Sequence, residues 1–410
     1  MVTWPVMARS TISEGGVVLA VGAVQFVNIL DFMMVMPLGP DFAKSLAIPV
    51  SHLGYVGGSY TAAASLSGIC GAFFLDRFDR RRALVVSLVG LAIGTMLGGF
   101  ATGMPTLLLA RVVAGAFGGP ATSLSYSIIA DVIPPERRGK AMGAVMGAFS
   151  VASILGVPVS LELATRGSWR TPFFVVGAAG ALVCALSFVA LPPMRRHLEG
   201  GGKADVPLSA LVRVDVLCSL SMTAVVMLAT FVVVPNISAY VMGNLHYPRE
   251  RLGLLYFVGG LASFATMRIA GALVDRFGSA IVGTAGSLGM ALVIFIGFAE
   301  FPPWLPPIGI FVSFMTAASF RNVSFNTLTS KVPRPAERAR FGSVQSSVQH
   351  LAGAVGAFVS SQILSETPTH ELLHMDRVSW TSIAISMALP PLLFVVERGV
   401  RRAAASPAPT

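Results

Sequence analysis

The sequence AFFLDRFDRRR at Ala72–Arg82 separates two long apolar stretches and contains Asp76 and four arginines. A similar stretch, GALVDRFG at Gly271–Gly278, follows about half a chain later. Asp76 and Asp275 are 199 residues apart in a chain of 410 residues. This spacing predicts two alike halves, each with the same charged loop between two apolar segments.

The composition is typical of an integral membrane protein. Hydrophobic residues make up 54% of the chain and charged residues only 12%, whereas soluble domains carry about 25% charged residues. The net charge of +10 does not indicate nucleic-acid binding, because the basic residues lie in short loops, where they set topology. The three cysteines lie in apolar runs and imply neither a disulfide framework nor a metal site. Residues 1–16 lack the pattern of a cleaved signal peptide, so we expect none.

Twelve apolar runs are each long enough for a helix to cross the hydrocarbon core, which takes about 20 residues. They lie at 17–39, 51–75, 83–102, 106–130, 141–163, 171–192, 213–242, 250–274, 281–299, 305–330, 342–364 and 377–397. We therefore expect an all-α membrane protein of twelve transmembrane helices. Its two six-helix halves would occupy 1–193 and 213–397, with a cytoplasmic linker at 194–212 and a cytoplasmic tail at 398–410.

Lysine and arginine residues set the expected orientation. With the N-terminus in the cytoplasm, twenty of the 29 Lys and Arg residues lie on the cytoplasmic side, six on the other side and three within spans. Because basic loops stay in the cytoplasm, we expect both termini there, in a cell inner (plasma) membrane.

A second pair of loops repeats at nearly the same offset. Pro135-Glu136-Arg137 follows the fourth span and Pro335-Ala336-Glu337-Arg338 follows the tenth, with Glu136 and Glu337 201 residues apart. Parallel repeats with a binding site between them at mid-membrane are an arrangement found in transporters.

On these residues the chain resembles the major facilitator superfamily over essentially its whole length. The family signature after the second helix reads Gly-x-Leu-Ala-Asp-Arg-x-Gly-Arg-Lys/Arg. Asp76 and Arg77 match its Asp-Arg pair and Arg80–Arg82 its basic end, while Ala72 and Asp79 replace its two glycines. The later copy keeps Gly271, Asp275, Arg276 and Gly278. The resemblance implies a secondary transporter that works by alternating access.

The charged loops are expected to form a conformational latch. Asp76 lies at the end of the second span, where it can cap a neighbouring helix or pair with an arginine across the halves. A polar latch favours one of two packings of the halves. Its expected members are Asp76, Arg77, Arg80, Arg81, Glu136, Arg137, Asp275 and Arg276. The alternative is that the arginines only anchor the topology.

The fourth span carries a charge within the membrane. Arg111 and Gly115 resemble the R-x-x-x-G motif of proton-coupled family members, and a stripe at helical spacing continues to Tyr126 through Gly118 and Thr122. A charge at this depth is expected to face the helix bundle and to be functional. In the alternative, Arg111 reaches the outer interface along its apolar stem.

Glycine and proline in the fifth span predict a helix-packing motif. Gly147, Gly156 and Pro158 resemble the antiporter motif of the drug-efflux branch, without its Gly-Pro-x-x-Gly-Gly ending. The segments ILGVPV at 154–159 and GSWRTPFF at 167–174 are more similar to the arabinose and sugar efflux permeases. Close packing of helices explains the glycines as well.

The first span carries a polar stripe of Gln25, Asn28 and Asp31. Asp31 lies about 14 residues, or roughly 20 Å, from the cytoplasmic end of its helix. A carboxyl group at this depth can load and release a proton, and the resemblance implies this role in several drug/proton antiporters. The alternative is a structural hydrogen bond from Asp31 to Arg111 or another helix.

Other polar residues lie within the later spans. They are Asn236, Arg268, Arg321, Asn326, Gln349 and His350. With Arg111, the basic groups outnumber Asp31 and Glu162. If they line one cavity, that cavity is net positive and suits anionic or zwitterionic amphiphiles. Alternatively, Arg268 belongs to the latch of the second half and His350 is a satisfied buried histidine.

The sequence predicts proton-coupled efflux of small hydrophobic or amphiphilic compounds by a monomer that needs no cofactor or metal. It contains no phosphate-binding loop and no catalytic constellation, so we expect an ion gradient to drive it and no enzyme activity. The alternatives are a sugar or organic-anion permease, a lipid flippase, or a transporter-like sensor without turnover.

Overall fold

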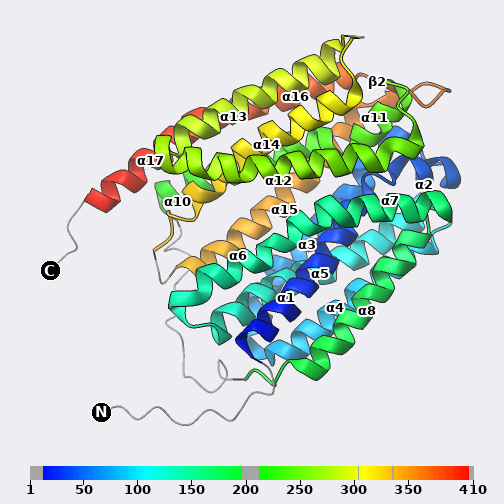
Figure 1. The fold of residues 1–410 in the computed structure, drawn as a ribbon. Coiled ribbons are helices and arrows are strands. Elements are labelled where there is room, and N and C mark those ends of the chain that lie inside the picture. The colour runs from blue at the N-terminus through cyan, green and yellow to red at the C-terminus, as the bar shows by residue number, and fades with distance from the viewer. Residues whose placement is uncertain (1–12, 196–211, 303, 335–336, 406–410) are drawn as a thin grey trace, which may run out of the picture.

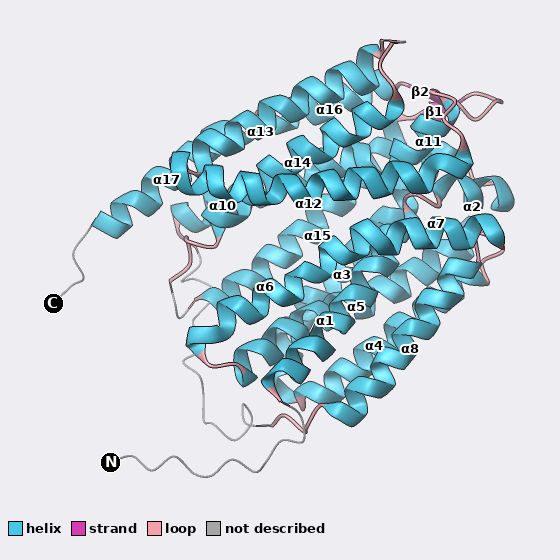
Figure 2. Cartoon of the chain, viewed as in Figure 1, coloured by secondary structure: helices cyan, strands magenta, loops and turns pink. Residues whose placement is uncertain are grey.

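The computed structural model describes residues 13–195, 212–302, 304–334 and 337–405. Side chains at 72–74, 76, 135–136, 338–339 and 403–405 are outside this description. The described chain is almost entirely helical (Figure 2).

The first half forms six spans, three of them broken into shorter helices. Its elements are α1 (Glu14–Val35), α2 (Gly39–Leu46), η1 (Val50–His52), α3 (Leu53–Phe74), η2 (Leu75–Arg77), α4 (Arg80–Gly99), α5 (Met104–Val132), α6 (Pro135–Val151), the π-helical η3 (Ala152–Gly156), α7 (Val157–Arg166) and α8 (Thr171–Ala190).

The second half repeats this order of spans and adds a short hairpin. Its elements are α10 (Val214–Val233), η5 (Val234–Asn236), α11 (Ile237–Gly243), η6 (Arg249–Arg251), α12 (Leu252–Phe277), α13 (Ser279–Ile294), the π-helical η7 (Phe295–Glu300), α14 (Pro307–Thr329), α15 (Arg338–Ile363), β1 (Ser365–Glu366), β2 (Leu372–Leu373), α16 (Met375–Ser386) and α17 (Leu389–Ala405). The two strands pair antiparallel, with Ser365 opposite Leu373.

The twelve expected spans match these helical stretches. Within the described residues, ten stretches are long and apolar enough to cross a membrane, and α3 and α15 complete the twelve. These two are rich in small residues because they pack against each other. A Cβ at Gly54 would lie 2.1 Å from the Ala357 carbonyl oxygen, and Ser65 donates a hydrogen bond to the Ser347 carbonyl (2.9 Å). Small residues let helices approach this closely in a membrane.

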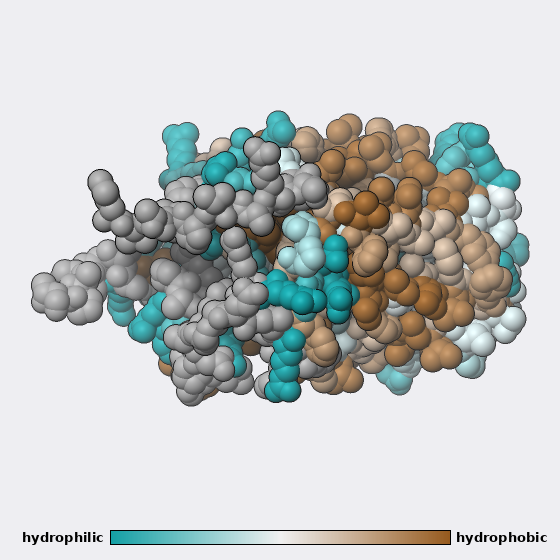
Figure 3. Space-filling view, turned by 90° about the horizontal axis from the view of Figure 1, so that it is seen from below, coloured by the Kyte–Doolittle hydropathy of each residue, from teal (hydrophilic) through white to brown (hydrophobic). Residues whose placement is uncertain are grey.

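The two halves lie side by side as two helix bundles, which α3 and α15 join (Figure 1). Helix α1 begins and α17 ends at one end of the molecule, which we call the terminal end; α2, α7, α11 and the hairpin lie at the opposite end. Figure 3 shows hydrophobic residues across the middle of the lower face and hydrophilic residues towards both ends. Leu182 and Val189 on α8 are among the exposed apolar side chains, and exposed apolar side chains suit contact with lipid.

The halves are joined at the opposite end and separated at the terminal end. Helix α12 packs on α7 and η3, and α2 on α11. At the terminal end, a Cβ added at Gly139, Gly143 or Gly147 of α6 would meet nothing within 4 Å, and the same holds at Gly271 of α12. The expected packing role of Gly147 is therefore wrong in this conformation, because its helix face is open there.

Candidate functional site

Asp31 and Arg111 form a buried ion pair between α1 and α5. Arg111 Nη1 donates to both carboxylate oxygens of Asp31, at 3.0 and 3.1 Å, and the exposed fractions are 0% for Asp31 and 1% for Arg111. Thr95 on α4 donates a third hydrogen bond to Asp31 (2.8 Å). The interpretation that Arg111 reaches the interface is wrong, because its charge is satisfied inside the bundle.

Three further side chains extend this pair into a network. The Arg111 guanidinium stacks over the Tyr60 ring, 4.6 Å from its centroid, a favourable cation–π geometry. Tyr60 donates its hydroxyl hydrogen to Asn28 Oδ1 (2.8 Å). Asn28 in turn donates to Thr122 (2.7 Å). We call Asn28, Asp31, Tyr60, Thr95, Arg111 and Thr122 the N-half cluster.

Glycines in α5 make room for this cluster. A Cβ at Gly118 would lie 2.3 Å from the Tyr60 hydroxyl, and one at Gly115 would lie 2.2 Å from the Tyr60 carbonyl oxygen. Tyr60 and Thr95 were not predicted, because a lone Tyr or Thr in an apolar span gives no periodic signal. The small residues after Arg111, Gly115 and Gly118, are the sequence feature that could have indicated the space that Tyr60 fills.

Two predicted residues lie near the N-half cluster without joining it. Gln25 is buried on α1, and its Nε2 has no hydrogen-bond partner among the described residues. Tyr126 is half-buried further along α5, and no contact joins it to the ion pair.

The polar residues of the second half differ in their burial and in their partners. Arg321 is 1% exposed and donates to Thr230 (2.6 Å). Asn236 is buried and donates to Ser360 (3.1 Å). Asn326 and Gln349 are exposed and His350 is half-buried. That they share a cavity with Asp31 stays a prediction.

The expected excess of positive charge also needs correction. Arg111 is neutralised by Asp31. Arg268 is exposed and stacks on Phe264 at 4.8 Å. Glu162 pairs with Arg166 on the surface (2.6 Å). Arg321 is the one charge of the set that is buried without an opposite charge among the described residues.

Aromatic rings connect the two halves at the level of the ion pair. Phe32, the residue after Asp31, lies 5.2 Å from the Tyr60 ring and 5.9 Å from the Phe231 ring across the half boundary. Phe231 follows Thr230, the partner of Arg321. The N-half cluster and Arg321 therefore approach the same boundary from opposite sides.

The loop at the terminal end of the first half is ordered by Asp79 instead of a glycine. Asp79 is the N-cap of α4 and accepts from the amides of Arg81 (2.9 Å) and Arg82 (3.2 Å). Arg195 adds a hydrogen bond at 3.2 Å. Burial raises the pKa of Asp79, but these donors outweigh it and hold the pKa below its usual value.

The predicted latch residues of the first half bind within that half. Arg80 pairs with Asp131 (3.4 Å), Arg81 donates to the Leu191 carbonyl (3.1 Å), and Arg137 pairs with Glu14 (3.1 Å). Arg77 is exposed. The side chains of Asp76 and Glu136 lie outside the described residues, so their predicted roles stay predictions.

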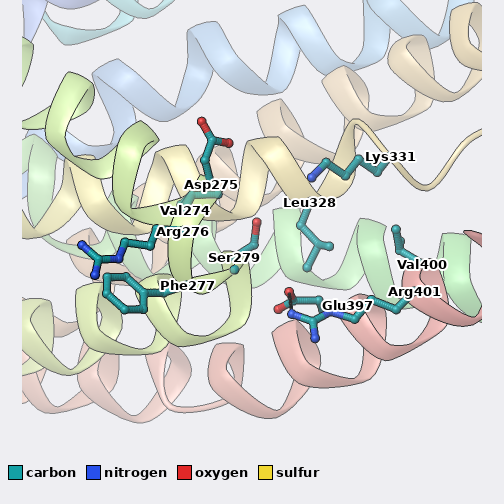
Figure 4. Close-up of a pocket in the computed structure, with 11 residues that line it drawn as sticks. Val274, Asp275, Arg276, Phe277, Ser279, Leu328, Lys331, Glu397, Val400 and Arg401 are labelled. Atoms are coloured by element: carbon teal, nitrogen blue, oxygen red, sulfur yellow. Dashed lines mark hydrogen bonds and ion pairs between the residues drawn. The ribbon is translucent and has the colours of Figure 1, made fainter.

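The second copy of the loop uses a different acid for the same purpose. Glu397 on α17 accepts from the Ala280 amide at the start of α13 (2.7 Å) and from Arg401 (2.7 Å). These residues line a pocket of about 340 Å³ (Figure 4). Asp275 and Arg276 are exposed, and Asp275 points away from Glu397 (Figure 4).

At the opposite end, two polar contacts tie the halves together. Arg249 on η6 pairs with Asp41 on α2, with Nε–O distances of 2.7 and 2.9 Å. Glu366 on β1 accepts from the amide of Val50 (2.5 Å) at the start of η1. We call these the opposite-end contacts. They were not predicted, because their partners are far apart in the chain and lie in loops without a recognisable pattern.

The fifth span is irregular where it meets the first and eighth spans. The π-helical η3 precedes Pro158, which has no amide hydrogen to donate. A Cβ at Gly156 would lie 2.7 Å from Leu30, and one at Gly260 of α12 would lie 3.2 Å from the Ser153 carbonyl. The predicted packing role of Gly156 thus agrees with its surroundings, and π-helical turns are frequent at functional sites.

Comparisons with known proteins agree with this architecture. The MFS-type transporter YceJ of Bacillus subtilis is 22% identical over 398 residues, covering 93% of this chain and 97% of its own. The chloramphenicol resistance protein of Streptomyces lividans is 26% identical over 258 residues, covering 62% and 66%. The crystal structure of a bacterial homolog of the human lysosomal transporter Spinster, inward-facing and unoccupied, aligns with a TM-score of 0.75 at 17% identity, covering 98% of this chain and 100% of that one.

The family assignment rests on the match over most of the sequence. The Major Facilitator Superfamily profile matches residues 21–357, a range that contains the N-half cluster, both charged loops and Arg321. Members of this family are transporters and not enzymes. The chain therefore belongs to the major facilitator superfamily, as a multi-pass membrane transporter of twelve helices.

Proposed function

We propose that this transporter exports small hydrophobic or amphiphilic compounds in exchange for protons. The observation that carries the proposal is the Asp31–Arg111 pair, which is buried beside the boundary of the halves, towards the opposite end of α1 and α5. An ionisable residue within the membrane is by default a functional candidate. The likeness to the Streptomyces lividans chloramphenicol resistance protein supports a drug-like substrate.

Proton exchange follows from the energetics of a buried ion pair. Removing one charge from such a pair leaves the other uncompensated, at a cost of roughly 3–5 kcal/mol. Protonation of Asp31 therefore releases Arg111 and favours a different packing of α1 against α5. A substrate that binds beside the pair favours the charged form, so proton and substrate occupy the site in turn.

The proposed orientation places the terminal end in the cytoplasm. The excess of basic residues at that end supports it. In this orientation, the open terminal end gives compounds access from the cytoplasm, and the opposite-end contacts close the path to the outside. The structure then corresponds to the state that loads substrate before export.

Transport into liposomes tests the proposal. Purified protein is reconstituted, and the lumen is made more acidic than the outside. An antiporter then accumulates labelled chloramphenicol or a lipophilic cation, and Asp31→Asn abolishes the gradient-driven part. Glu162→Gln is the matched control, because Glu162 is an exposed acid paired with Arg166, and it should transport normally.

A second measurement separates loss of coupling from loss of folding. Exchange of labelled for unlabelled substrate across the membrane needs no pH gradient. Wild type should show this exchange, and Asp31→Asn, which mimics the protonated form, should lose it together with accumulation while still eluting as a folded protein in size-exclusion chromatography. Accumulation by Asp31→Asn at the wild-type level, or by wild type without a gradient, would refute proton antiport through Asp31.

A further inference from the structure

The buried charges of the two halves are not balanced in the same way. In the first half, Arg111 faces Asp31. In the second half, Arg321 has no carboxylate partner among the described residues. Every Asp and Glu after residue 213 lies in a loop, in the strand β1 (Glu366), at a cap or in an end turn of a helix, except Glu397, which binds the Ala280 amide at the terminal end.

Arg321 is held in place with donor capacity to spare. It lies 14 residues after the start of α14, about 20 Å along the helix, and is 1% exposed. Its Nη2 donates to Thr230, whereas its Nε has no hydrogen-bond partner in the described chain. A buried guanidinium carries five N–H donors and no acceptor, so this one can still bind an anion.

The position of Thr230 connects this charge to the boundary between the halves. Thr230 lies on α10 and is half-buried, and its hydroxyl donates to the Val226 carbonyl (2.6 Å) while it accepts from Arg321. The next residue, Phe231, contacts Phe32 of the first half. Phe231 therefore places an aromatic ring at the boundary one residue along α10 from Thr230, the residue that binds Arg321.

We propose that Arg321 and Thr230 form an anion subsite for the acidic group of an amphiphilic organic acid. The carboxylate or sulfonate oxygens take hydrogen bonds from the free donors of Arg321, and the apolar part of the ligand lies against Phe231. The ligand thereby supplies the negative charge that the second half lacks. The subsite rests on the proposed function, because it adds a substrate class to the same transport path.

A pair of probes of equal shape tests the charge directly. Binding of tritiated 2-naphthoate and of uncharged 2-naphthamide is measured on purified protein in nanodiscs, without any pH gradient. Wild type should bind 2-naphthoate about tenfold or more tightly than 2-naphthamide, as expected for a charge-assisted hydrogen bond in a buried site. Arg321→Gln should remove this preference, and Arg321→Lys should restore part of it.

Two further variants make the result specific. Thr230→Val keeps the side-chain shape but removes the hydroxyl, and it should weaken 2-naphthoate binding more than 2-naphthamide binding even if Arg321→Gln fails to fold. Arg268→Gln, which removes an exposed arginine of α12, should leave both affinities unchanged. Equal binding of the two probes by wild type, or an unchanged preference in both Arg321→Gln and Thr230→Val, would overturn the proposal.

The outcome is independent of proton coupling. If the preference for 2-naphthoate depends on Arg321 but Asp31→Asn still accumulates substrate under a gradient, the subsite stands and the antiport mechanism fails. If Asp31→Asn loses accumulation but Arg321→Gln keeps the preference, the antiport mechanism stands and the subsite fails.

Discussion

Asp31 and Arg111 give up most of their hydration when they are buried together between α1 and α5. Their attraction and the hydrogen bond from Thr95 (2.8 Å) compensate for this loss only while both charges are present. The sequence showed both residues and even their pairing as an alternative. It did not show Tyr60, whose ring covers the Arg111 guanidinium and holds it against the carboxylate.

Single and double substitutions should separate the structural role of the pair from its role in transport. Arg111→Met leaves Asp31 buried and unpaired, so it should destabilise the protein by roughly 3–5 kcal/mol. Asp31→Leu combined with Arg111→Met removes both charges and should recover most of the thermal stability, measured by size-exclusion chromatography after heating. The double variant should still lack gradient-driven transport. A double variant as unstable as Arg111→Met would contradict this account.

Replacing glycine by alanine should have opposite effects on stability at Gly118 and at Gly147. Gly118→Ala should lower the unfolding temperature, because its Cβ would lie 2.3 Å from the Tyr60 hydroxyl and 2.7 Å from Asn28 Oδ1. Gly147→Ala should be neutral or stabilising by up to about 1 kcal/mol, because Ala favours helix and the space around Gly147 is open. A loss of stability in Gly147→Ala would show that the open face of α6 closes in the dominant state.

At the scale of elements, a carboxylate holds the start of the third span in each half. That carboxylate is itself bound by an arginine in or just after the sixth span. Asp79 and Arg195 do this for α4, and Glu397 and Arg401 for α13. The capping acid comes from the loop in one half and from α17 in the other. The repeat of loop sequences therefore predicted the position of this device but not the residues that build it.

The cap on α4 should have a measurable pH dependence. The pKa of Asp79 is lowered in the folded protein, so its contribution is complete above the unfolded value of about 3.9 and is lost as the pH falls through the folded value. At pH 7, Asp79→Ala should cost about 0.5–2 kcal/mol, as for other N-caps. The difference from wild type in thermal unfolding should persist at pH 5 and shrink below about pH 4. Asp275→Ala is the control: it removes an exposed acid and should change stability little at any pH. If the stability difference between Asp79→Ala and wild type does not depend on pH, the cap is not charged.

At the scale of the whole molecule, the sequence predicts the features that depend on local composition and on repeated motifs. The twelve spans follow from apolar length, and the two halves follow from the repeated loops around Asp76 and Asp275. The opposite-end contacts could not be predicted, because Asp41 and Arg249 meet only after both halves have folded. The same holds for the separation of Arg321 from the N-half cluster, since periodicity places a residue on a helix face but does not say which helix covers that face.

The opposite-end contacts should bias the transporter towards the conformation that is open at the terminal end. Both Asp41 and Arg249 are about one-fifth exposed, so the pair is worth about 1 kcal/mol or less, a shift of up to roughly fivefold between two conformations. Asp41→Asn with Arg249→Gln should therefore favour closure of the terminal end.

Spin labels at Lys140 and Lys331, both exposed at that end, report this closure as a larger share of short distances between the labels. The labels are introduced on a background without Cys70, Cys184 and Cys218. Arg166→Gln, which breaks an ion pair within one helix, should leave the distribution as in wild type. If the double variant also leaves it unchanged, the Asp41–Arg249 pair does not bias the conformational equilibrium.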